Sequence, residues 1–323
     1  MSEARHVRLQ QCLCGLAGTR KQEPTDEIPL RDRKEEADDV LLVDRMVKKY
    51  RRFAAVKGVS FGVKRGECFG LLGVNGAGKT TTFRMLTGDE VPTGGDAVVR
   101  GHSLKKHPRE FLSQLGYCPQ FDALNDCLTG RETLQLFAHL KGIPRGSIEQ
   151  EVTSGTKLGT SPIFKVRYLV SYIGLTEHAS RLCGTYSGGN KRKLSTAMAL
   201  IGDPPIVFLD EPTSGVDPVA RRNLWNVLAQ IQSTGQSIVL TSHSMEECEA
   251  LCNRLAIMVN GQFVCMGGNQ YLKKRFGQGF TVMIKLGMIK DDKDLIDVKN
   301  AMELIFRRDC ELKDEHKVSI YEI

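Results

Sequence analysis

The sequence predicts an α/β fold in which a parallel sheet carries a phosphate-binding loop. Residues 73–80 have the sequence GVNGAGKT, which matches the pattern G-x-x-x-x-G-K-[ST]. An apolar run at 67–72 precedes this loop and indicates a buried strand, while 81–86 follows it with helical character. Three further apolar runs end in polar residues, at the sheet edge where α/β proteins place ligand contacts. These residues are Gln120, Asp210 and His243.

The residues of the phosphate-binding loop have distinct predicted roles. Gly73, Gly76 and Gly78 allow a tight bend, so that successive N–H groups point into one concavity at the positive end of a helix. Lys79 supplies a charge for the β- and γ-phosphates, and Thr80 offers a hydroxyl to Mg²⁺. The alternative is a chance match in a glycine-rich turn, which the flanking strand and helix disfavour.

The composition is that of an ordinary globular protein. The chain has 323 residues, of which 41% are hydrophobic and 26% charged, with a formal net charge of +7. No apolar run approaches the ~18 residues of a membrane span, and the N-terminus lacks the apolar core of a signal peptide. The ten cysteines contain no C-x-x-C pair, which favours reduced thiols over a zinc site. Basic clusters such as 191–193 are interpreted as solvated helix faces, since no nucleic-acid-binding pattern accompanies them.

The N-terminal part is predicted to be a leader followed by an antiparallel β subdomain. Residues 1–39 are rich in both charges and have little to bury, which is typical of disorder. Strands are predicted near 40–43 and over 55–63, ahead of the phosphate-binding loop. Tyr50 lies near the end of the first strand. It could stack on an adenine ring or pack in the core.

The middle of the chain is predicted to form a helical subdomain over about 121–200. Residues 129–132 resemble a capping box at the start of a helix that runs to residue 140. Residues 153–163 have the composition of an inserted loop. Ser187, Gly188 and Gly189 open a further helix and form a second predicted anion-binding nest, although a plain glycine-rich helix start is the alternative.

Two acids and a histidine carry the predicted chemistry at the ends of later strands. Asp210 ends the apolar run 206–209 and is predicted to hold Mg²⁺. Glu211 is predicted to face the γ-phosphate and polarise the attacking water, or else to be an exposed turn acid. His243 can hydrogen-bond a γ-phosphate oxygen, although a lone histidine is more often structural.

The C-terminal part is predicted to close the nucleotide-binding domain and begin another. A helix over 220–231 has an apolar stripe in which Trp225 is interpreted as core. Asn260 and Gly261 indicate a hairpin turn between two strands. Residues 280–323 are predicted to be a partial β-α-β unit.

These motifs, in this order, resemble the nucleotide-binding domain of an ABC transporter over about residues 40–279. Particular stretches are similar to the A subfamily, the lipid exporters: GECFGLLGVNGAGK at 66–79, GYCPQFD at 116–122, YSGGNKRKLS at 186–195 and HSMEECEALC at 243–252. The resemblance implies a P-loop NTPase fold of ABC type, with an antiparallel β subdomain, a helical subdomain and a truncated α+β appendage. The chain looks like the second, C-terminal nucleotide-binding domain, with the start of a regulatory domain at 280–323.

The resemblance also implies ATP and Mg²⁺ as cofactors and a role for each site residue. The nucleotide contacts implied within the chain are Tyr50, Gly73, Asn75, Gly76, Ala77, Gly78, Lys79, Thr80 and Thr81. The catalytic residues implied are Glu211, His243 and Gln120. The Mg²⁺ ligands implied are Thr80, Gln120 and Asp210. Ser187, Gly188, Gly189 and Asn190, here called the signature turn, are implied to bind the ATP of a partner domain, and Asp217 to link the two sites.

The implied partners are a second nucleotide-binding domain in a head-to-tail dimer, transmembrane domains and a transported lipid, but no nucleic acid. ATP hydrolysis would then drive lipid transport from the cytosolic face of a membrane. The sequence departs from ABC proteins in general at Tyr186 and Asn190, which stand in place of Leu and Gln, as in the A subfamily. Two alternatives are a truncated, non-transporting ATP-binding regulatory module and a soluble ABC protein that acts on ribosomes or DNA. The second is disfavoured because only one nucleotide-binding domain is present.

Overall fold

The computed structural model describes residues 39–143 and 166–276. The chain divides into two compact units, Met1–Gln278 and Gly279–Ile323. The predicted leader, apart from Asp39, lies outside the described residues, as do the insertion at 153–163 and the β-α-β unit at 280–323. These three remain predictions.

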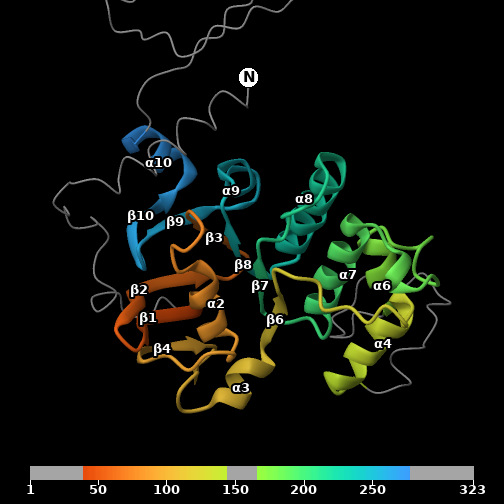
Figure 1. The fold of residues 1–323 in the computed structure, drawn as a ribbon, viewed down its shortest axis with the longest axis horizontal. Coiled ribbons are helices and arrows are strands. Elements are labelled where there is room, and N and C mark those ends of the chain that lie inside the picture. The colour runs from red at the N-terminus through yellow and green to blue at the C-terminus, as the bar shows by residue number, and fades with distance from the viewer. Residues whose placement is uncertain (1–38, 144–165, 277–323) are drawn as a thin grey trace, which may run out of the picture. The chain divides into compact units, whose positions relative to one another are not determined.

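An antiparallel sheet forms the N-terminal part of the described chain (Figure 1), as predicted. Its strands follow the order β2-β1-β4-β5. They are β1 (Asp39–Tyr50), β2 (Phe53–Lys64), β4 (Gly94–Val99) and β5 (His102–Ser103). In β1, Leu41, Val43 and Met46 are all fully buried, although strict alternation would place Met46 on the opposite face from Val43. A register shift between those two residues, with Arg45 at φ 41°, restores the inward direction.

A second, mostly parallel sheet has the order β10-β9-β3-β8-β7-β6. Its strands are β3 (Cys68–Leu72), β6 (Leu115–Cys118), β7 (Ile206–Asp210), β8 (Ser237–Ser242), β9 (Arg254–Val259) and β10 (Gln262–Gly268). Neighbours from β6 to β9 pair in parallel, and β10 returns antiparallel across the predicted Asn260-Gly261 turn, where both residues have positive φ. The carboxyl ends of β3, β6, β7 and β8 therefore meet at one edge.

Helices pack against this sheet and extend to one side of it (Figure 1). They are α2 (Lys79–Leu86), α3 (Pro108–Ser113), α4 (Gly130–Leu140), α6 (Val166–Tyr172), the 3₁₀ turn η1 (Cys183–Thr185), α7 (Gly188–Leu200), α8 (Pro218–Ser233), α9 (Met245–Leu251) and α10 (Asn269–Phe276). Helices α4, α6 and α7 gather at the end away from the antiparallel sheet, within the predicted helical region.

The parallel sheet contributes side chains to two hydrophobic cores, one on each of its faces. Cys68 and Leu72 of β3 join the core built with the helices, while Phe69 and Leu71 join the core shared with the antiparallel sheet. Phe69 stacks on Phe61 of β2 with ring centroids 5.0 Å apart. Because both faces are covered, the central strands β3, β7 and β8 are buried along their whole length and mostly apolar.

Most of the local sequence patterns predicted the helix ends and core residues correctly. The capping box at Thr129 and Glu132 is confirmed, and half-buried Trp225 packs against the helical core as predicted. Ser244 is the N-cap residue of α9, but its side chain makes no capping hydrogen bond. The Ser242 hydroxyl oxygen instead accepts a hydrogen bond from the Ser244 amide at 2.9 Å.

Candidate nucleotide-binding site

The phosphate-binding loop leaves β3 and turns directly into α2, as its sequence predicts. Gly78, just ahead of α2, has φ 107°, and a Cβ there would lie 2.7 Å from the carbonyl oxygen of Ala55. A Cβ at Gly73 would lie 2.5 Å from the carbonyl oxygen of Met258. Glycine is therefore required at Gly78 for backbone conformation and at both positions for close packing.

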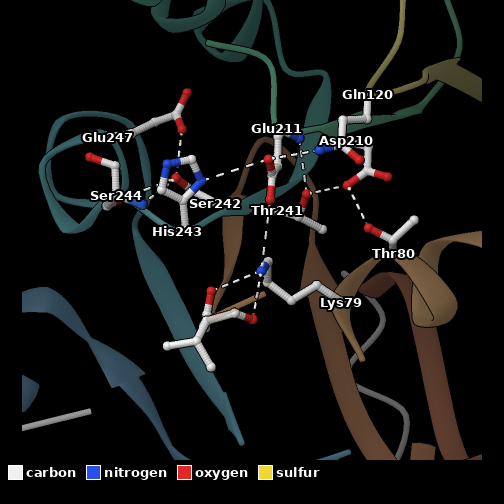
Figure 2. Close-up of polar contacts among 12 residues, drawn as sticks. Lys79, Thr80, Gln120, Asp210, Glu211, Thr241, Ser242, His243, Ser244 and Glu247 are labelled. Carbon is white, nitrogen blue, oxygen red and sulfur yellow. Dashed lines mark hydrogen bonds and ion pairs between the residues drawn. The ribbon is translucent and has the colours of Figure 1, made fainter. Parts of the chain in front are cut away.

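Lys79 lies inside the loop it belongs to (Figure 2). Its ammonium group donates to the carbonyl oxygens of Gly73 at 2.8 Å and Val74 at 3.2 Å, and lies 3.8 Å from Oε1 of Glu211. Burial lowers the pKa of Lys79, and the negative charges of Glu211 and Asp210 oppose that shift. The loop thus surrounds a buried cation that donates hydrogen bonds to two of the loop's own carbonyls.

Asp210 carries the features of a cation ligand. Its Oδ1 accepts from the hydroxyl of Thr241 and lies 3.5 Å from the hydroxyl of Thr80. Its Oδ2 is buried and has no hydrogen-bond partner among the described residues. Burial raises the pKa of Asp210, an effect that the Thr241 hydrogen bond opposes. An unpartnered carboxylate oxygen beside a hydroxyl suits Mg²⁺, which prefers oxygen ligands.

Glu211 is the point at which the strand ends converge (Figure 2). Gln120 donates from Nε2 to Oε2 of Glu211 at 3.0 Å, and Nδ1 of His243 lies 3.7 Å from the same oxygen. Glu211 is 7% exposed, so the alternative of an exposed turn acid is wrong. Its φ of 45° is left-handed, a conformation that costs a non-glycine residue about 1–3 kcal/mol and is often found at functional sites.

The signature turn lies at the start of α7, and its capping hydrogen bond is made within that helix. The hydroxyl of Ser187 caps α7 by accepting from the amide of Asn190 at 3.3 Å. Asp217 caps α8 by accepting from the amide of Ala220 at 3.0 Å. A Cβ at Gly189 would lie 3.7 Å from Oδ1 of Asp217, so the two caps are close neighbours. In the described part of the chain, no hydrogen bond or ion pair joins the signature turn to the phosphate-binding loop.

Tyr50 lies on the surface, and the alternative of a core residue is wrong. The residue is 40% exposed, and the ammonium of Lys48 lies 5.0 Å from the ring centroid. That ammonium also pairs with Glu90 at 2.6 Å. Stacking of Tyr50 on adenine remains a prediction. Among the other predicted contacts, Asn75 and Gly76 are exposed, Thr81 is half-buried and Ala77 is buried.

Sequence reasoning missed three residues that hold the site together. Thr241 and Ser242 end β8, and their hydroxyls bond Asp210 and the buried Glu247 respectively. Arg192 was assigned with 191–193 to a solvated helix face, which is wrong because its side chain is 3% exposed. Its partners are backbone carbonyls and the Asp122 carboxylate, all from distant segments, so no nearby sequence signal marks it.

Residues 56–214 match the family model described as ABC transporter. The chain contains an ATP-binding domain of the ABC transporter family. It is 55% identical over 250 residues to ATP-binding cassette sub-family A member 7 of Rattus norvegicus, covering 77% of this chain and 11% of that protein. It is 53% identical over 271 residues to the retinal-specific phospholipid-transporting ATPase ABCA4 of Homo sapiens, covering 83% of this chain and 11% of that protein. With human phospholipid-transporting ATPase ABCA7 the identity is 53% over 250 residues, with coverages of 77% and 11%.

Solved structures share the fold of this ABC domain. One, described as the ATP binding subunit of an ABC transporter, matches with a TM-score of 0.63 and 28% identity, covering 74% of this chain and 93% of its own. Another is a dimeric post-hydrolysis state of an ATP-binding cassette bound to ADP and Pi, with a TM-score of 0.59 and 20% identity, covering 71% and 98%. The predicted fold class and the predicted similarity to the A subfamily are confirmed. The chain spans about a tenth of the length of the curated relatives, and no described helix is long and apolar enough to cross a membrane.

Proposed function

We propose that this domain binds Mg-ATP at the phosphate-binding loop and hydrolyses it to ADP and phosphate. The observation that carries the proposal is the convergence of Lys79, Gln120 and His243 on the buried carboxylate of Glu211. A cation, an amide and an imidazole around one carboxylate form a set suited to orienting water and stabilising phosphate charge.

Each residue has a definite task in this proposal. Lys79 gives up its hydrogen bonds to the loop carbonyls and donates to the β- and γ-phosphates instead. Glu211, held in place by Gln120, accepts a proton from the attacking water. His243 donates to a γ-phosphate oxygen. Thr80, Asp210 and Gln120 would hold Mg²⁺, which neutralises phosphate charge when bound. Tyr50 would stack on the adenine, and Asn75, Ala77 and Thr81 would line the phosphates.

ABC domains dimerise, and we infer a head-to-tail pairing for this one. The signature turn presents exposed Ser187 and Gly188 at the N-terminus of α7, away from the chain's own phosphate-binding loop. Amides at a helix start bind anions. The turn would therefore contact the ATP held by a second domain, with Asp217 linking the two sites.

The larger assembly is inferred from the relatives. Two of them are named phospholipid-transporting ATPases, which supports a lipid as the transported substrate and transmembrane domains as partners. The domain would then act at the cytosolic face of a membrane, as the second nucleotide-binding domain of such a transporter.

The test uses purified full chain with Mg-ATP. Turnover per molecule should rise with protein concentration, because the active form contains two domains. Glu211→Gln should retain ATP binding and lose hydrolysis, whereas Glu177→Gln, an exposed glutamate outside the site, should match wild type. Concentration-independent turnover would overturn the shared site, and normal turnover in Glu211→Gln would overturn its role as base.

A further inference from the structure

Arg192 is a buried cation with an unusual set of partners. It lies two residues beyond the signature turn on α7, and its side chain is 3% exposed. All three of its guanidinium nitrogens donate hydrogen bonds. The acceptors are the carbonyl oxygens of Pro119, Gln120, Asp210, Glu211 and Pro212, together with Oδ1 of Asp122.

The carbonyls belong to the two segments that carry the proposed catalytic side chains. Nη1 donates to the carbonyl of Gln120 at 3.2 Å, just beyond β6. Nη2 donates to the carbonyls of Asp210 at 2.6 Å and Glu211 at 3.1 Å, at the end of β7. Nε donates to Pro212 at 2.8 Å. One side chain therefore holds both segments against the first turns of α7.

This arrangement requires the chemistry of arginine. A planar guanidinium offers five N–H groups in a fixed fork, whereas a lysine ammonium offers three donors from one point. Asp122 is the carboxylate that pairs with Arg192, at 3.3 Å, and it also accepts from the Ser195 hydroxyl at 2.8 Å. The carbonyl dipoles supply most of the solvation of this buried charge, so removing the guanidinium would leave several carbonyls without donors.

We propose that Arg192 is a positioning residue that couples the signature turn to this chain's own catalytic carboxylate. It fixes the backbones of Gln120 and Glu211, so that their side chains keep their 3.0 Å contact. Because it extends from the helix that begins at the signature turn, a shift of that turn on binding a partner's nucleotide is transmitted to Glu211. This inference rests on the proposed hydrolysis by paired domains.

The first test compares Arg192→Gln with Lys193→Gln in the full chain. Lys193 is the next residue of α7, is half-buried, and has no hydrogen bond or ion pair among the described residues, so it is a matched control. Arg192→Gln should lower kcat by about 100-fold, the scale expected when a catalytic group is misplaced by about 1 Å. The Kd for Mg-ATP should change less than about threefold, because Arg192 makes no hydrogen bond to the phosphate-binding loop. Lys193→Gln should match wild type in both.

Two further measurements separate positioning from a general loss of structure. Millimolar guanidinium should partly restore kcat to Arg192→Ala, while ammonium should not. In a Gln120→Ala background, Arg192→Gln should cost much less than it does alone, because it acts through that residue. Asp122→Asn, a change at an exposed position, keeps the test open if both arginine variants misfold: its kcat should fall severalfold with Kd unchanged.

The outcomes are distinct. A wild-type chain with no turnover at any concentration overturns the proposed function. If wild type turns over and Arg192→Gln equals it, or loses ATP affinity in parallel with kcat, the positioning role is wrong. Additive losses in the Gln120→Ala background, or an Asp122→Asn variant with unchanged kcat, also overturn it.

Discussion

The phosphate-binding loop and the signature turn both lie at the start of a helix, but their surroundings differ. Each is a glycine-containing turn that opens a helix, at residues 73–80 and 187–190. Around the first, Lys79, Asp210 and Glu211 are all buried. The Lys79 ammonium lies 3.8 Å from Glu211, and Asp210 accepts a hydrogen bond from Thr241. Around the second, the capping bond of Ser187 stays within its own helix, and Ser187 and Gly188 are solvent-exposed. The first region is assembled from buried groups of one chain, whereas we propose that the second meets a nucleotide held by another domain.

The largest expected effect comes from breaking the assembled region. Lys79→Met should raise the Kd for ATP by about 100-fold, because it removes a buried cation and its charge-assisted hydrogen bonds to phosphate. Isothermal titration calorimetry measures this directly. Lys105→Met, at an exposed lysine, is the control. Equal Kd values for the two variants would show that the loop does not hold the nucleotide.

A smaller loss of binding, but a large loss of turnover, is expected from the signature turn. Ser187→Arg should leave ATP affinity within a few-fold of wild type, since no hydrogen bond or ion pair among the described residues joins the turn to the chain's own loop. The same variant should abolish hydrolysis. Mixed with Lys79→Met chains, it should regain turnover, because each mixed pair contains one intact site. With random pairing, about a quarter of wild-type activity is expected. A mixture no more active than its parts would contradict the shared site.

The difference between these regions also explains what the sequence could predict. Gln120, Asp210 and His243 each follow an apolar run, so parallel strand order was enough to place them at one edge. The phosphate-binding loop and the capping box were likewise local patterns. The partners of Arg192 come from segments about 70 and 20 residues away, and its burial depends on which side of α7 meets them.

Burying the Asp210 carboxyl beside the phosphate-binding loop costs stability, and thermal unfolding can measure this cost. Burial raises the pKa of Asp210 in the folded chain. The folded carboxyl therefore keeps its proton at pH values where the unfolded chain has released it, above about 4. Stability falls as pH rises from there until the folded carboxyl also ionises. At neutral pH, Asp210→Asn should raise the nucleotide-free Tm by about 2–4 °C, roughly 1 kcal/mol, while hydrolysis is lost.

The control for that experiment is pH. Below pH 4 the aspartate is protonated in both states, so the Tm advantage of Asp210→Asn should disappear. Thermal unfolding followed by circular dichroism at several pH values gives both numbers. An Asn variant that is less stable at neutral pH would show that the hydrogen bonds of the carboxylate outweigh its desolvation.

The smallest effect concerns Asp217, which lies between the two regions. As the N-cap of α8 it should contribute about 1 kcal/mol, and Asp217→Ala should lose this stability whatever else the residue does. Asp217→Asn keeps a side-chain oxygen that can accept from the Ala220 amide, because asparagine caps as well as aspartate. If Asp217 links the paired sites, the Asn variant should keep the wild-type Tm and lose severalfold in turnover. Wild-type turnover in that variant would show that Asp217 acts only as a helix cap, and Arg192 would remain the proposed link between the two regions.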